Sequence, residues 1–218
     1  MMHMPMLLAL LFSWLLPGGG DNAAERTAEA APAVSVKATA SGLYTELCLD
    51  GELKESVFNA CYRRMENKGI KGHVIAIADM TQPSDAKRFY IIDLDKKELV
   101  LRTYVAHGQG SGERMATSFS NKEGSHATSL GLYRIGAEIV SPKHGAALLL
   151  HGLERGVNCQ AESREVIMHG ADYVSETFIA EHGRLGRSWG CPAVSRADMP
   201  LMLELLADGG LLYVHAGK

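Results

Sequence analysis

The chain has 218 residues, enough for one ordinary domain with a real core and a short appendage. Its hydrophobic fraction of 46% and charged fraction of 22% are typical of a globular protein. The 22 Lys and Arg residues against 25 Asp and Glu residues give a formal charge of -3, so we expect no nucleic acid partner.

The chain opens with an apolar run of eleven residues, 6–16, which ends at Pro17 and three glycines. A helix of that length is only about 16 Å long and cannot form a stable membrane span, because the bilayer core is about 30 Å thick. The run is typical of the apolar region of a signal peptide. We therefore predict a signal peptide over residues 1–20 and export to the periplasm or cell envelope. The alternative is a buried or membrane-associated N-terminal helix.

The next residues predict a tether and then the start of the domain. Residues 21–40 are rich in Ala, Glu, Thr and Pro and have no aromatic residue, which indicates a flexible tether. Residues 41–218 are predicted to form the domain. Apolar residues recur at helical spacing over 43–68, a segment that Asp50-Gly51 splits, and Gly69 suits a helix C-cap.

From residue 72 the apolar period becomes that of strands. The expected strands are 73–78, 88–94, 98–105, 131–135, 147–151, 164–169 and 211–215. The expected late helices are 175–182 and 196–207. Several short strands with few helices predict a mainly β fold.

The residues with the clearest chemistry are His169 and Cys191. His169 stands at the end of a predicted strand, and a glycine-rich turn precedes Cys191. A free thiol has a pKa of about 8.5 and is mostly protonated at neutral pH, so a nucleophilic cysteine needs a base such as imidazole. The spacing of His169 and Cys191 alone also allows a structural alternative, in which Cys191 is a buried packing residue.

The residues around Cys191 fit nucleophilic attack. Gly190 has no Cβ and lets backbone N–H groups face an oxyanion. Pro192 lacks an N–H, so the donors have to come from Gly190, Cys191 or elsewhere. A third group should orient the imidazole, and we assign this role to the carbonyl or hydroxyl of Ser188.

The His-Gly segment at 169–170 and the block from Gly186 to Val194 resemble the murein L,D-transpeptidase catalytic domain family, which is YkuD-like. The resemblance covers roughly residues 70–215. It includes the glycine-bearing segment that begins at His107 and the His-Gly pair at His151. Trp189 stands where many members of the family have a second histidine.

The resemblance implies an L,D-transpeptidase-like β-sandwich with a few peripheral helices. It implies a cysteine acyltransferase in which Cys191 attacks a peptidoglycan stem peptide, forms a thioester and releases the terminal D-Ala, with no cofactor. It also implies a substrate-binding surface, to which we assign Arg187, Trp189, His151, His107 and Gly170. Trp189 is either a wall of this surface or a wedge in the core.

Several alternatives remain open from sequence. An L,D-carboxypeptidase or other thiol hydrolase on the same fold would differ only in the acceptor, and a non-catalytic peptidoglycan-binding domain would not cut. Three histidines that precede glycine, His107, His151 and His169, could form a zinc site, but their spacing lacks a metal motif and we expect no metal. If Cys191 is a free thiol, Cys48, Cys61 and Cys159 permit at most one disulfide.

Overall fold

The structure, a computed structural model, describes residues 39–217. The predicted signal peptide and all of the predicted tether except its last two residues lie outside the described residues. Between residues 39 and 217, no helix is long and apolar enough to cross a membrane.

Eight strands form one hydrogen-bonded sheet in the order β3-β2-β1-β8-β4-β5-β6-β7. Their bounds are β1 Val74–Asp79, β2 Phe89–Asp93, β3 Glu98–Thr103, β4 Gly131–Ser141, β5 Gly145–Gly152, β6 Ile167–Gly170, β7 Ala193–Val194 and β8 Leu211–His215. The β1–β8 and β6–β7 pairs are parallel, and the other pairs are antiparallel. The predicted mainly β fold is therefore confirmed.

The central strands are buried on both faces, which explains their continuous apolar sequences. Successive side chains of a strand point to opposite faces. In β1, Ala76 and Ala78 belong to the main core, whereas Ile75 and Ile77 belong to a second cluster on the other face. The apolar side chains on both faces of the central strands therefore have to be buried by other elements.

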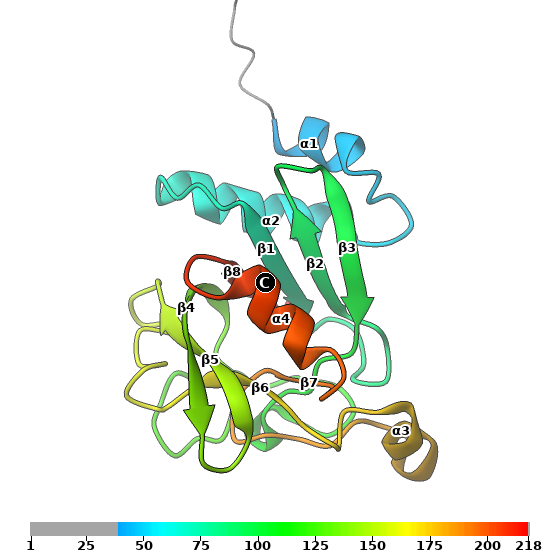
Figure 1. Ribbon diagram of the computed structural model, residues 1–218, viewed down its shortest axis with the longest axis vertical. Helices are drawn as coiled ribbons and strands as arrows, with labels where there is room; N and C mark the ends of the chain where they lie inside the picture. Colours follow the sequence, from blue (N-terminus) through cyan, green and yellow to red (C-terminus); the bar gives the residue numbers. More distant parts are fainter. Residues whose placement is uncertain (1–38, 218) are drawn as a thin grey trace, which may run out of the picture. The chain divides into compact units, whose positions relative to one another are not determined.

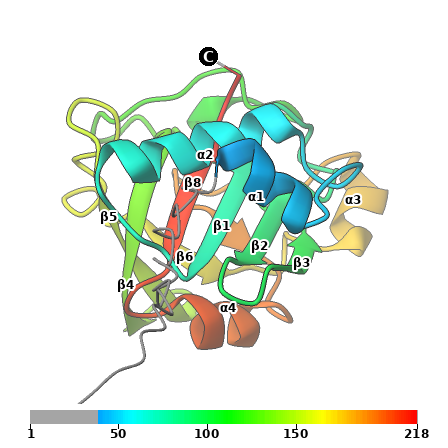
Figure 2. The ribbon, with the colours of Figure 1, turned by 90° about the horizontal axis from the view of Figure 1, so that it is seen from above.

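The helices α1 (Ala40–Glu46) and α2 (Glu55–Asn67) cover the second cluster, and α4 (Met199–Leu206) covers the main core (Figures 1 and 2). Val57, Cys61 and Met65 recur every four residues along α2 and are all buried. Gly69 has a φ of 63° just beyond this helix, as its predicted C-cap role requires.

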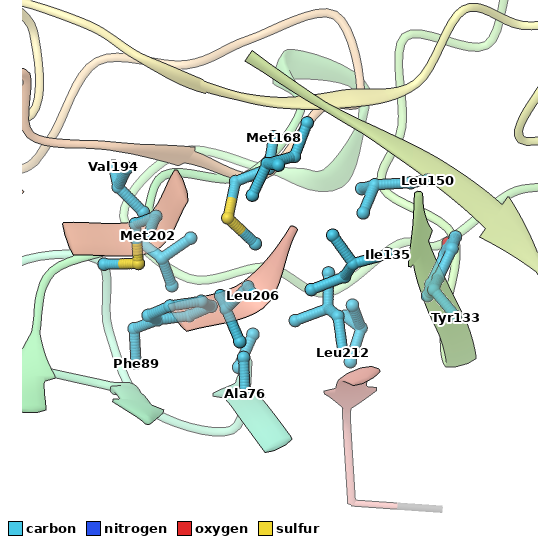
Figure 3. Close-up of a cluster of buried hydrophobic side chains, with 14 of the residues drawn as sticks. Ala76, Phe89, Tyr133, Ile135, Leu150, Met168, Val194, Met202, Leu206 and Leu212 are labelled. Atoms are coloured by element: carbon cyan, nitrogen blue, oxygen red, sulfur yellow. The ribbon is translucent and has the colours of Figure 1, made fainter. Parts of the chain in front are cut away.

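The main core lies where the two ends of the sheet approach each other. Phe89 of β2 and Met168 of β6 share this core although their strands lie near opposite ends of the strand order. Figure 3 shows Met168 and Val194 facing Met202 of α4 across the cluster. The sheet therefore curves around its core as a sandwich does, and burial of a side chain such as Met168 contributes about 1.5–3 kcal/mol.

Some element bounds differ from the predicted ones. Helix α1 begins at Ala40, inside the predicted tether, because the Thr39 side chain accepts a hydrogen bond from the Gly42 N–H and caps it. Strand β4 runs to Ser141 rather than ending at Ile135, since a bulge between Ile135 and Glu138 carries it on into an exposed hairpin arm.

Three shorter elements complete the fold near the sheet end that carries β6 and β7. Helix α3 (Glu176–His182) begins after its cap Ser175 and ends at Gly183 in the left-handed conformation. The 3-10 turn η1 (Gln109–Ser111) and strand β7 were not predicted. Helix α4 begins at Met199, three residues later than expected.

Candidate active site

His169 and the turn that carries Cys191 lie on neighbouring strands. His169 of β6 is paired with Ala193 of β7, two residues after Cys191. The His169 N–H donates to the carbonyl oxygen of Pro192 at 3.4 Å. Met168 points into the main core, so His169, the next residue along the strand, points to the opposite face.

The His169 ring is oriented by the residue that follows it. Its Nδ1 lies 3.2 Å from the carbonyl oxygen of Gly170. A carbonyl only accepts hydrogen bonds, so Nδ1 carries the proton and the lone pair of Nε2 can accept one. The prediction that Ser188 orients this ring was wrong, because the Ser188 hydroxyl bonds within its own turn.

The surroundings of His169 keep its imidazole neutral. Burial lowers its pKa to about 4, and the positive charges of Lys143 and Arg196 act in the same direction, as does His144. The Gly170 carbonyl offsets only part of this effect. At neutral pH, His169 is therefore a neutral imidazole that can accept a proton.

The Ser188 hydroxyl holds the nucleophile turn together. It donates to the Cys191 carbonyl oxygen at 2.6 Å and accepts from the Gly190 N–H at 3.1 Å. The Gly190 N–H, which we predicted as an oxyanion donor, is thus already engaged. Pro192 has no N–H, whereas Cys191 has one that this turn can offer to an oxyanion.

Glycine is required at two positions because backbone segments pack directly against each other. Gly190 has a φ of 122°, and a Cβ there would lie 2.9 Å from the Ala127 carbonyl oxygen and 3.0 Å from Nη2 of Arg164. A Cβ on Gly108 would lie 2.8 Å from the Cα of Gly190. The glycines after His107 and before Cys191 therefore form one close contact.

The Cys191 thiol is protonated in this environment. Burial raises its pKa above the ordinary value, while the Ile167 N–H and the positive charges of Arg164 and Lys143 offset part of the rise. Its Sγ lies 3.9 Å from the carbonyl oxygen of Glu165, and within residues 39–217 no hydrogen bond joins Sγ to His169.

Trp189 forms a wall beside this turn rather than a wedge in the core. Its side chain is 65% exposed, and its ring stacks on His126 with the ring centroids 4.9 Å apart. The Lys143 ammonium lies 5.0 Å from the centre of the indole ring. A pocket of about 340 Å³ opens here, lined by Glu123, Gly124, His126, Ser163, Arg164, Glu165 and Trp189.

His107 was predicted to bind substrate, but the structure buries it beneath the turn. Its Nδ1 accepts from Nη2 of Arg88 at 2.7 Å, and its Nε2 lies 3.3 Å from the Gly112 carbonyl oxygen. Burial lowers its pKa to about 4. Its carbonyl oxygen accepts from the Ser188 N–H at 3.0 Å, so His107 supports the turn from below.

The other predicted substrate residues are placed as follows. Arg187 is engaged by Glu113, with 2.6 Å between its Nη1 and a carboxylate oxygen. His151 lies on β5, with its Nδ1 3.3 Å from a carboxylate oxygen of Glu162. Gly170 is buried and contributes its carbonyl oxygen to His169.

Two residues near the site were not among the predicted site residues: Arg164, which opens the predicted strand 164–169 but lies in the loop before β6, and His144, which lies between predicted elements. Arg164 donates to the carbonyl oxygens of Ser120 at 2.9 Å and Ala127 at 2.7 Å and to the Ser129 hydroxyl at 3.2 Å. His144 stacks on His169. No local sequence signal distinguishes either residue.

Within residues 39–217, no group of three or more His, Cys, Asp or Glu side chains is arranged to hold a metal ion. All four cysteines are free in the structure. The site offers a thiol, an imidazole and nearby positive charges.

Comparisons with known proteins identify the domain. A family model described as the L,D-transpeptidase catalytic domain matches residues 50–215, which is more than half of the chain. The comparison with curated proteins finds no match.

Similar solved structures include an L,D-transpeptidase from Mycobacterium smegmatis, with 15% identity and a TM-score of 0.41 over 67% of this chain and 60% of that chain. The helical cell shape determining protein Pgp2 from Campylobacter jejuni has 14% identity and a TM-score of 0.46 over 68% and 48%. An L,D-transpeptidase (Yku) from Stackebrandtia nassauensis has 14% identity and a TM-score of 0.41 over 83% and 78%. The matched region thus spans less than two thirds of the first two proteins. On the family match, this chain belongs to the L,D-transpeptidase catalytic domain family.

Proposed function

We propose that this chain is a cysteine acyltransferase that acts on peptidoglycan stem peptides in the cell envelope. The observation that carries the proposal is the β6–β7 register, which brings the Cys191 turn beside His169 within a domain of this family. A neutral thiol, a neutral imidazole with a free Nε2 and several positive charges suit a reaction that develops negative charge on a thiolate and then on an oxyanion.

In the proposed first half-reaction, Nε2 of His169 takes the Cys191 proton as Sγ attacks the carbonyl carbon of the third stem residue. The carbonyl electron pair moves to its oxygen, where the N–H of Cys191 stabilises the negative charge. The C–N bond to the terminal D-Ala then breaks, and the proton on His169 passes to the departing amine. A thioester and free D-Ala result.

In the second half-reaction, an acceptor amine attacks the thioester carbon. His169 accepts a proton from this amine, the C–S bond breaks, and the proton returns to the sulfur. Cys191 carries the nucleophilic attack and His169 the proton transfers of both steps.

The test is to incubate the full, reduced chain with a disaccharide-tetrapeptide and to measure the intact protein mass. We expect an adduct equal to the substrate minus D-Ala. Cys191→Ala should lack it, whereas Cys159→Ala, the matched removal of an exposed thiol, should retain it. His169→Gln should slow adduct formation by about 10²–10⁴-fold. An adduct that persists in Cys191→Ala, or no adduct on the folded chain, would contradict the proposal.

A further inference from the structure

The tip of the β4–β5 hairpin reaches over the site. Ser141 at the end of β4 is paired with Gly145 at the start of β5, so residues 142–144 form a tight turn. Gly145 has a φ of 74°, and the His144 N–H donates to the Ser141 hydroxyl at 3.4 Å. The backbone therefore fixes the place from which Lys143 and His144 project.

Both of these side chains contact residues of the site. The rings of His144 and His169 are stacked, with 3.7 Å between centroids and 25° between planes. The contact follows from the register, because Ala147, three residues after His144, is paired with His169. Lys143 lies over the Trp189 ring. One turn thus touches both the proposed base and the residue two positions before the proposed nucleophile.

We propose that His144 is a positioning residue that holds the His169 imidazole by its face. The hydrogen bond from Nδ1 to the Gly170 carbonyl fixes one edge of the ring but leaves it free to tilt about that bond. A stacked ring at 3.7 Å removes this freedom and shields one face from water. The lone pair of the His169 Nε2 then stays oriented to accept the proton of the Cys191 thiol. The inference rests on the proposed roles of His169 and Cys191.

The charge state of His144 also matters to the reaction. His169 becomes a cation when it takes the thiol proton, and a neutral aromatic ring against its face favours that cation. A protonated His144 would oppose it. Burial lowers the pKa of His144, and Lys143 and Arg196 act in the same direction.

The groups that face the two rings set the resulting pH dependence. They are Lys143 from the same turn and Arg196 from the segment after β7, where Arg196 pairs with Asp172 at 2.6 Å. His144 therefore remains neutral over the range in which the thiol is to be activated, and its protonation contributes to the loss of rate in acid.

The test compares His144→Ala with His144→Phe in the full chain. The first variant removes the stack, and the second keeps an aromatic face that cannot titrate. His182→Ala is the matched control, because His182 stacks on Phe178 at 4.0 Å on the exposed helix α3. The measured quantities are the rate constant and KM of acyl-adduct formation from the tetrapeptide as a function of pH, and Tm.

We expect His144→Ala to lower the rate constant about tenfold with little change in KM, because the base is misplaced rather than the substrate lost. His144→Phe should recover most of the rate and keep it to lower pH than the wild type. The control should match the wild type. If His144→Ala keeps the wild-type rate and pH profile, or if His144→Phe is as slow as His144→Ala while both are folded, the positioning role is overturned.

A second readout separates this inference from the proposed function. Iodoacetamide alkylation of Cys191, followed by peptide mass spectrometry, reports on the thiol and its base without any peptidoglycan. If no form reacts with the tetrapeptide, the proposed function fails. The positioning role still stands if His144→Ala shifts the alkylation pH profile toward that of His169→Gln and His144→Phe does not. An unshifted profile overturns it.

Discussion

Replacing Ser188 with alanine tests how the nucleophile turn is held. The Ser188 hydroxyl spans the turn, since it donates to the Cys191 carbonyl oxygen at 2.6 Å and accepts from the Gly190 N–H at 3.1 Å. Ser188 is only 6% exposed, and Gly190 is buried, so water does not readily replace the lost partner. Ser188→Ala therefore leaves a buried donor unpaired while it hardly changes the packing.

The magnitude follows from these two bonds. An unpaired buried N–H costs about 1–3 kcal/mol, and the lost hydrogen bond to the part-buried Cys191 carbonyl costs about 1 kcal/mol. We expect the free energy of unfolding to fall by about 2–3 kcal/mol, which corresponds to a Tm lower by about 5–10 °C for a domain of this size. Formation of the acyl-enzyme should slow about 10- to 100-fold, because the Cys191 N–H is no longer held toward the oxyanion.

Urea denaturation measures the first effect, and the rate of adduct formation from the tetrapeptide measures the second. Ser118→Ala is the control, because Ser118 is an exposed serine outside residues 186–194, and its effect should stay within about 0.5 kcal/mol. The reasoning would be refuted by a Ser188→Ala protein whose free energy of unfolding lies within that same margin of the wild type. A faster reaction in this variant would show instead that the released Gly190 N–H is the better oxyanion donor.

Three further predictions concern other parts of the structure. The pKa of both His107 and His169 is about 4 in the folded chain, so below about pH 6.5 the unfolded chain binds protons that the folded chain does not. The free energy of unfolding from urea denaturation should therefore fall between about pH 6.5 and 4, by up to about 3 kcal/mol for each histidine, and less steeply in His169→Gln. Arg88→Met should lower the free energy of unfolding by about 3 kcal/mol. The reason is that the buried guanidinium donates to the carbonyl oxygens of Gln82 and Val105 and to His107. An unchanged free energy of unfolding in urea would contradict this. Peptide mapping at pH 7 should find that iodoacetamide alkylates Cys159 before Cys191. The Gly156 N–H and Asn121 lower the pKa of Cys159, whereas burial raises the pKa of Cys191. The reverse order would show that the Cys191 thiol is already activated in the free protein.

The sequence predicted best those features that depend on neighbouring residues. The apolar runs in β1, β2 and β8 are long enough to mark strands, and the structure has each within one residue or so of its expected bounds. The helical segment 43–68 was predicted with its break at Asp50-Gly51, and α1 and α2 flank that break. The position of His169 near the end of a strand was likewise predicted, from the apolar run before it and the glycine after it.

Features that depend on pairing between distant segments could not be predicted from the sequence. The sequence around His144 reads as loop, and its contact with His169 exists only because the β4–β5 bulge and the β5–β6 register set where the hairpin tip lies. His107 has the same His-Gly pattern as His169, yet it points inward to Arg88. A two-residue strand such as β7 has too few residues to show a period of its own.

The strand order has a consequence for how the chain is assembled. Strand β8 lies in the middle of the sheet, between β1 and β4, although it comes last among the described strands. Until residues 211–215 are available, one edge of β1 has no partner and the two halves of the sheet have no common strand. A growing or C-terminally clipped chain should therefore expose an unpaired strand edge, which is prone to aggregate, and should be unable to bring the base and the thiol together.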